Sequence, residues 1–215
     1  MILTGLAPDP RRPDYRLVEV DRGRFASLPA EALVDLNLAI GREIEPLVME
    51  RLQELADVEA AHRAALRAVA RRAHACGDLR RRLLQKQHPP AAVDAALDRL
   101  RSAGLLDDAR FAVDYAAAKA RRGRGPSRLA RDLQAQGVDR RVAEEAVRTS
   151  LAAEGVDPAE AVRALAEKRA RQLAGLPLAV KKRRLVAFLA RRGFGGAEVR
   201  EVVERLDNPG ASPRG

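Results

Sequence analysis

The chain has 215 residues, of which 47% are hydrophobic and 33% are charged, so it can bury a core and is not disordered by composition. Its 40 lysines and arginines outnumber its 30 acids, and the net charge of +10 favours a polyanionic partner. A single cysteine excludes an internal disulfide framework, no apolar run is long enough to span a membrane, and residues 1–4 lack a signal-peptide pattern. These features indicate a basic, soluble, cytoplasmic protein.

The first part of the chain differs in charge from the rest. Residues 1–58 hold 7 Lys/Arg and 11 Asp/Glu, a net charge of −4, whereas residues 59–215 hold 33 and 19, a net charge of +14. The proline-rich residues 1–13 are expected to form a loose tail. Tyr15–Val20, a turn at 21–24 and a return strand to Leu28 predict a β-hairpin. Short helices over 29–41 and 45–54 complete a predicted N-terminal module, residues 1–58.

From residue 59 the pattern is helical, and it repeats. Leu79, Leu129 and Leu185 are each followed four residues later by another leucine, which indicates a repeat of about fifty residues. We predict three three-helix repeats over 59–105, 106–154 and 155–207, followed by a disordered tail over 208–215. The predicted fold is therefore all-α: an elongated array of three tandem three-helix repeats, preceded by a small hairpin-and-helix module.

Each repeat has recognisable helix starts and stops. The expected helices are 59–73, 77–87 and 91–103, then 107–123, 127–136 and 140–151, then 157–174, 178–192 and 197–206. Asp107, Asp139 and Asp157 stand where N-caps are expected. Phe111 and Tyr115 lie four residues apart on one helix face, and we expect them in the core.

Catalytic motifs are absent from the sequence. It has no GxxxxGK[ST] phosphate-binding loop, no HExxH and no GxSxG. The paired acids at 107–108 and 144–145 stand at helix starts, where capping explains them. The potential metal ligands are His62, His74, Cys76 and His88, which lack paired ligand spacing. We therefore predict no enzymatic activity, no metal and no cofactor.

Basic clusters are the most informative feature. Any one of them could be an ordinary solvated helix face, but they recur at equivalent places in the repeats. Stacked repeats would align them into a basic stripe, suited to nucleic acid or to a protein with an acidic groove. The members are Arg71, Arg72, Arg80, Arg81, Arg82, Lys119, Arg121, Arg122, Arg124, Arg128, Arg131, Lys181, Lys182, Arg183, Arg184, Arg191 and Arg192.

Three segments carry a recognisable pattern. Residues 104–115 read GLLDDARFAVDY and continue through RRGRGP at 121–126. ARRAHA at 70–75 precedes LRRRL at 79–83, and residues 185–194 read LVAFLARRGF. Together these segments resemble the RecX family, whose members regulate the RecA recombinase. The segment at 70–83 is similar to the first-repeat segment of the family, and the one at 185–194 is similar to its third-repeat segment. The hairpin-like start is similar to the N-terminal segment of longer members. One departure is Gln87-His88-Pro89-Pro90, where the family has glycine, so we expect proline to build that turn and to shift the helix junction.

The resemblance implies a non-enzymatic protein that binds RecA and RecA–DNA filaments. Such a protein inhibits RecA ATP hydrolysis, strand exchange and filament growth, and so modulates recombinational DNA repair and the SOS response. The basic residues between 119 and 131 are the first candidates for contact, because they lie on the segment most similar to the family. DNA, single- or double-stranded, is a further expected partner, a membrane is not, and we expect a monomer.

Two alternatives remain at this point. A general DNA-binding protein could affect RecA only by competing for DNA, and its binding would weaken steeply with salt. A nuclease would need a metal-binding acid cluster in the basic stripe, and the sequence shows none.

Overall fold

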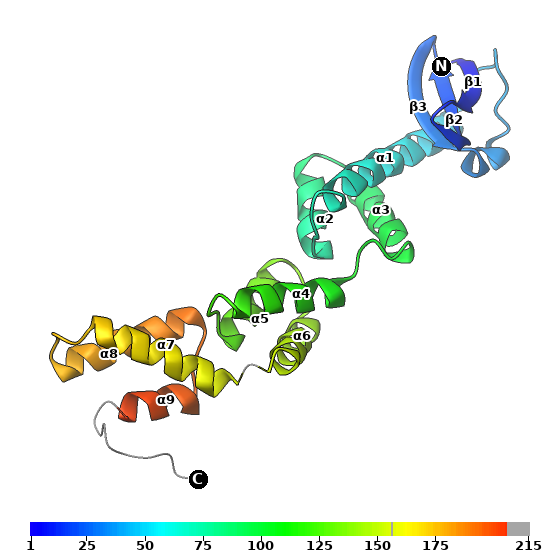
Figure 1. Cartoon of the computed structure of the whole chain (residues 1–215). Coiled ribbons are helices and arrows are strands. Elements are labelled where there is room, and N and C mark those ends of the chain that lie inside the picture. The colour runs from blue at the N-terminus through cyan, green and yellow to red at the C-terminus, as the bar shows by residue number, and fades with distance from the viewer. Residues whose placement is uncertain (156, 206–215) are drawn as a thin grey trace. The chain divides into compact units, whose positions relative to one another are not determined.

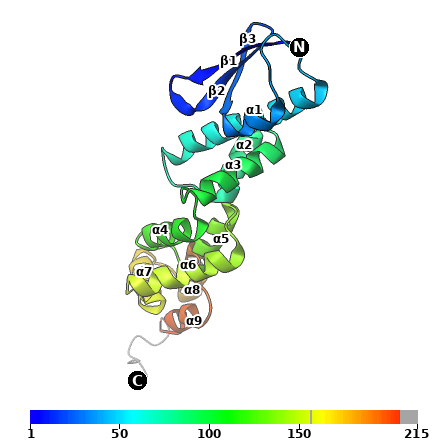
Figure 2. The ribbon, with the colours of Figure 1, turned by 90° about the vertical axis from the view of Figure 1, so that its right-hand side faces the viewer.

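The computed structural model describes residues 1–155 and 157–205. The chain divides into two compact units, the first from Met1 to Leu106 and the second from Asp107 to the C-terminus. The first unit begins with a small sheet and continues as helices, and the described part of the second unit is helical, as Figures 1 and 2 show. This architecture confirms the mostly helical fold class with three three-helix repeats. The predicted tail at 208–215 lies outside the described residues.

The N-terminal sheet has three antiparallel strands rather than the predicted two. They are β1 (Leu3–Asp9), β2 (Arg12–Val20) and β3 (Gly23–Pro29), in the order β1-β2-β3. The expected hairpin is β2–β3, but the expected loose tail is wrong, because β1 pairs with β2 and buries Leu3. Pro8 is compatible with this pairing because β1 is an edge strand, where a missing N–H is tolerated.

The helix predicted over 29–41 is a shorter 3₁₀ helix, Glu31–Leu36, which ends at Asn37 with φ of 46°. The two helices predicted over 45–54 and 59–73 are one continuous helix, α1 (Pro46–Val69). No glycine or proline interrupts the sequence between residues 47 and 69, so the helix has no reason to stop. One end of α1 packs against the sheet, as Figure 1 shows, through a core that includes Leu28 and Leu52.

The first repeat is formed by α1, α2 (Cys76–Gln85) and α3 (Pro90–Ser102). Its core contains Leu79 and Leu83, the repeated leucines of this segment, which are fully or nearly fully buried. Hydrogen bonds link the sheet to this repeat through the side chains of Tyr15, Glu59 and Arg99. The buried Glu59 carboxylate accepts hydrogen bonds from the Arg99 guanidinium and, at 3.4 Å, from the Tyr15 hydroxyl.

The expectation that proline builds the turn after α2 is wrong. Gln87 itself takes the left-handed conformation there, with φ of 63°, where Gly137 and Gly193 have 85° and 88°. The amide of the next residue bonds five residues back in all three repeats: residue 88 to 83, 138 to 133 and 194 to 189. These are the hydrogen bonds of a Schellman helix end, so the junction is the same in each repeat.

The second unit holds repeats two and three. The second repeat comprises α4 (Asp108–Ala120), α5 (Pro126–Ala135) and α6 (Arg140–Ala153), and the third comprises α7 (Pro158–Gln172), α8 (Leu178–Arg192) and α9 (Ala197–Glu204). Asp107, Asp139 and Asp157 each cap the following helix by accepting from its first amides, as predicted. The repeated leucines at 129, 133, 185 and 189 are fully buried.

Candidate functional site

Seven basic side chains converge in the second unit around an open cavity of about 780 Å³. They come from the end of α4, the turn after it, α5 and the end of α8. We call this site the α4–α5–α8 pocket, and its basic members are Lys119, Arg122, Arg124, Arg128, Arg131, Arg191 and Arg192. All seven were predicted as contact residues. The fold brings together members that are about seventy residues apart in the sequence.

Backbone contact between two glycines assembles this pocket. The Gly125 amide donates to the Arg192 carbonyl at 2.7 Å, and the Ser127 amide donates to the Gly193 carbonyl at 3.2 Å. A Cβ on Gly125 would lie 2.6 Å from the Gly193 carbonyl carbon, and one on Gly193 would lie 2.3 Å from the Arg128 Cβ. Only glycine fits this approach. The pocket is therefore composite, with α4 and α5 from repeat two and α8 from repeat three.

The pocket is strongly positive because no described acid lines it and a single carboxylate pairs with its cations. Among the described residues, Asp132 is the only acid that pairs with these seven side chains, through Arg124 and, at 2.9 Å, Arg128. The other five, which are Lys119, Arg122, Arg131, Arg191 and Arg192, have no acidic partner within the described part of the chain, although Arg192 donates to the backbone carbonyls of residues 122 and 123. Guanidinium groups with free donors bind phosphate or carboxylate groups bidentately. The pocket can therefore hold a polyanion.

Tyr115 contacts two of the cations that line this pocket, although the sequence predicted it in the core. Tyr115 and Phe111 are both half-buried, with ring centroids 6.1 Å apart. The Lys119 ammonium lies 5.5 Å from the Tyr115 ring centroid, and Arg124 donates to the Tyr115 hydroxyl at 3.5 Å. Burial, with the nearby Asp132 carboxylate, raises the pKa of Tyr115, so the hydroxyl stays neutral. The four-residue spacing of Tyr115 and Lys119 was the available signal.

Arg121 does not line the pocket, although its neighbour Arg122 does. The Arg121 guanidinium binds the Glu154 carboxylate through two hydrogen bonds, of 2.9 and 2.6 Å. These bonds lower the pKa of Glu154 and keep it ionised. Arg121 therefore has a structural partner on another helix end, while Arg122 remains available to a ligand.

A second basic site lies in the first unit, around a cavity of about 450 Å³ between α1 and α2. We call it the α1–α2 pocket, and its titratable members are Arg67, Arg71, Arg72, His74, Arg82 and Lys86. Arg67 was not among the predicted residues. Arg80 lies outside the pocket, because it binds Asp94 at 2.7 Å.

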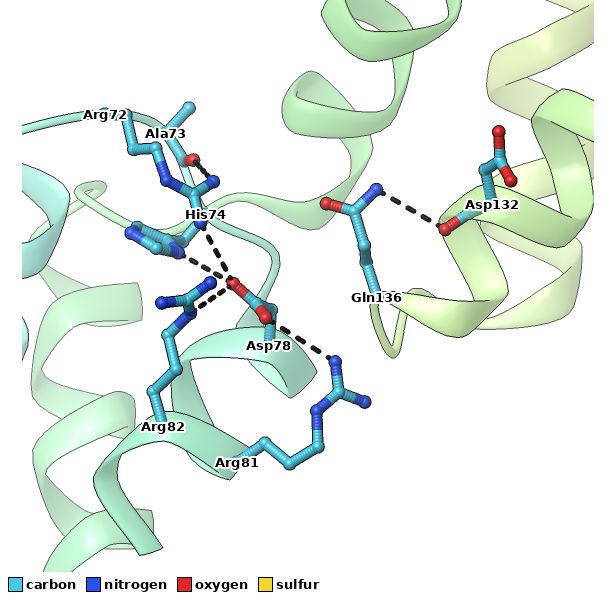
Figure 3. A network of polar contacts seen from close by, with 8 residues as sticks. All are labelled: Arg72, Ala73, His74, Asp78, Arg81, Arg82, Asp132 and Gln136. Atoms are coloured by element: carbon cyan, nitrogen blue, oxygen red, sulfur yellow. Dashed lines mark hydrogen bonds and ion pairs between the residues drawn. The ribbon is translucent and has the colours of Figure 1, made fainter. Parts of the chain in front are cut away.

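Asp78 is the centre of the polar network beside the α1–α2 pocket, shown in Figure 3. Its carboxylate contacts the His74 ring and the Arg82 guanidinium, both at 2.9 Å, and Arg72 and Arg81 at 3.5 Å. Burial alone would raise the pKa of Asp78, but the hydrogen bonds from His74 and Arg82 outweigh it and lower the pKa. Asp78 is therefore ionised and partly neutralises the cluster.

The two pockets use the same helix positions with opposite charges. The position just before the buried leucine at 79 or 129 holds Asp78 in repeat one and Arg128 in repeat two. The position three residues after that leucine holds Arg82 in repeat one and Asp132 in repeat two. Both pairs close at 2.9 Å across one helical turn. The acid and the arginine exchange positions between the two repeats, but in both repeats the ion pair lies next to a basic cavity.

The remaining predicted residues lie on α8 and line neither cavity. Lys181 and Lys182 are half-buried, and Arg183 and Arg184 are exposed. The structure thus gathers the clusters within each unit, and a continuous stripe along the whole chain stays a prediction. Within residues 1–155 and 157–205, no helix is long and apolar enough to cross a membrane, and no three potential metal ligands lie together.

Comparisons with known proteins identify the repeats. The first, second and third three-helix domains of RecX match residues 61–100, 107–147 and 156–203. The chain is similar to regulatory protein RecX of Halorhodospira halophila, with 36% identity over 69% of this chain and 89% of that protein. It is also similar to the RecX of Mycobacterium ulcerans, with 37% identity over 67% of this chain and 83% of that protein.

Solved structures share the fold. A crystal structure of regulatory protein RecX has a TM-score of 0.72 at 19% identity, covering 94% of this chain and 98% of that one. RecX from Lactobacillus salivarius has a TM-score of 0.59 at 19% identity, covering 70% of this chain and 97% of that one. From the three matched domains and the close relatives, the chain belongs to the RecX family, a family of regulatory, non-enzymatic proteins.

Proposed function

We propose that this protein binds RecA filaments on DNA and restrains their ATP hydrolysis, strand exchange and growth, with the α4–α5–α8 pocket as a principal contact. The observation that carries the proposal is the composition of this pocket, in which seven cations have only the carboxylate of Asp132 as an acidic partner, through Arg124 and Arg128. Five of the cations have no acidic partner among the described residues. A regulator without chemistry of its own must act by binding, and this is a surface built to bind an anionic partner.

The test is a titration of the protein into RecA hydrolysing ATP on single-stranded DNA, at fixed salt and far below the amount that would cover the DNA. Loss of hydrolysis at these low ratios supports direct action on the filament. Loss only near saturating coverage favours the alternative of a DNA-binding competitor, whose effect should also disappear steeply with salt. No loss at any ratio contradicts the proposal.

A charge-reversal variant tests the pocket itself. Arg122→Glu, Arg131→Glu and Arg191→Glu together reverse three cations that have no acidic partner, so the fold should be retained while inhibition weakens at least about tenfold. The matched control reverses three exposed arginines of the same unit that do not line the pocket: Arg110, Arg141 and Arg200. Equal loss of inhibition in both variants would mean that overall charge matters and the pocket does not.

A further inference from the structure

Four arginines surround a third cavity, of about 470 Å³, in the N-terminal part of the first unit. Arg11 and Arg12 lie at the turn between β1 and β2, Arg24 lies on β3, and Arg63 lies on α1. Three of these arginines belong to the segment before residue 59, which carries a net charge of −4, so a positive cluster is not expected there from the composition. The sheet also lies outside the matched RecX domains, which begin at residue 61.

Acidic side chains neutralise these arginines only in part. Among the described residues, Asp9 is the only acid that lines the cavity, and its carboxylate accepts from the Ser27 hydroxyl at 2.6 Å and the Arg11 amide at 2.9 Å. Within the described part of the chain, no acidic side chain forms an ion pair with Arg11, Arg24 or Arg63. The cavity therefore has a net positive charge and several unused guanidinium donors.

Arg12 is held in place before any ligand arrives. Its guanidinium lies 4.7 Å from the centroid of the Tyr15 ring and 3.5 Å from the buried Glu59 carboxylate. Glu59 is itself neutralised by Arg99, so it does not cancel the charge of the cavity. A guanidinium stacked on a ring loses less side-chain freedom when it binds a ligand.

We propose that this cavity is a phosphate-binding site, which takes a phosphate group from a nucleic-acid backbone or from free phosphate. Four arginines from three separate elements surround one cavity, an arrangement that fits an anion with oxygens on several sides. The planar fork of each guanidinium matches phosphate oxygens. The site is separate from both the α1–α2 pocket and the α4–α5–α8 pocket, because it shares no lining residue with either.

The test follows the backbone amides of the full-length, ¹⁵N-labelled chain by NMR, because this readout is local and is not obscured by the other basic sites. A short oligothymidylate, inorganic phosphate and a polyglutamate peptide are titrated separately. Saturable shifts at residues 9, 11, 12 and 24 with oligothymidylate or with phosphate are the expected result. The probe that saturates at the lower concentration identifies the source of the phosphate group. No shift with either phosphate probe, or a shift with polyglutamate alone, overturns the proposal.

A matched pair of variants completes the test. Arg24→Gln with Arg63→Gln removes two guanidinium groups that form no ion pair within the described part of the chain, and should weaken the local affinity about tenfold. Arg42→Gln with Arg51→Gln removes the same charge from exposed positions of the same unit outside the cavity, and should leave the affinity unchanged. Undiminished binding by the first pair would also overturn the proposal. Because RecA is not involved, failure here leaves the proposed function standing.

Discussion

Gly125→Ala should separate the two halves of the α4–α5–α8 pocket without changing any charge. Gly125 has φ of −79° and ψ of 163°, a conformation open to any residue, so alanine costs nothing in backbone strain. The cost is steric, because the added Cβ would lie 2.6 Å from the carbonyl carbon and oxygen of Gly193. Gly193 cannot shift along α5 to make room, since it already packs against the Arg128 backbone. Alanine must therefore push the end of α8 away.

The magnitude follows from what this movement breaks. Forcing a methyl group into a packed contact costs about 1–3 kcal/mol. Moving α8 also weakens the hydrogen bonds from the Gly125 amide, at 2.7 Å, and the Ser127 amide, at 3.2 Å. With about 0.5 kcal/mol for each weakened bond, the docking of repeat three onto repeat two should weaken by about 2–4 kcal/mol. The cores of the individual repeats, around leucines 129 and 185, should remain intact.

Hydrogen exchange measures this effect locally. The amides at positions 125 and 127 should exchange about 30-fold faster or more in the Gly125→Ala variant, while those of the helix interiors stay protected. Inhibition of RecA should fall, because Arg191 and Arg192 leave the pocket. Gly175→Ala is the control, since a Cβ there meets nothing within 4 Å. If exchange at 125 and 127 and inhibition are both unchanged in Gly125→Ala, the glycine contact does not assemble the pocket.

Two further predictions concern the first repeat. Gln87→Gly should stabilise the chain by about 0.5–1 kcal/mol in urea unfolding, because glycine adopts the φ of 63° at this helix end without a Cβ penalty; a destabilised variant would contradict this. The pKa of Asp78 is lowered in the folded state, so the folded protein binds this proton less readily than the unfolded chain does. The ionised carboxylate therefore stabilises the fold at pH values above 3.8, its pKa in the unfolded chain, and this stabilisation is lost as the pH falls through the folded pKa. Asp78→Asn should be less stable at neutral pH and should lose less stability than the wild type on acidification below about pH 4; equal acid dependence of the two proteins in pH-dependent thermal unfolding would refute this assignment.

The helical part of the fold could be predicted from local sequence. The three aspartate caps and the recurring leucines reappear where expected because a cap bonds amides two or three residues away, and a helix face repeats every turn. The family resemblance rests on the same local patterns. The continuous α1 was also within reach, since no breaker separates the two helices that were expected.

Tertiary structure decided the parts that depend on distant partners. Residues 1–13 look like a loose tail because Pro8, Pro10 and Pro13 oppose regular structure, and only pairing with β2 makes residues 3–9 a strand. Arg121 and Arg122 are alike in sequence, but Glu154 binds the first and the cavity receives the second. The pocket itself depends on Gly125 meeting Gly193, a contact between segments sixty-eight residues apart. The sequence by itself thus determined the helices, their ends and the supply of positive charge, because these follow from interactions within a few turns. Only the packing of one repeat on the next decided which cations face a ligand, because the direction of a side chain and its partner are set by neighbours far along the chain.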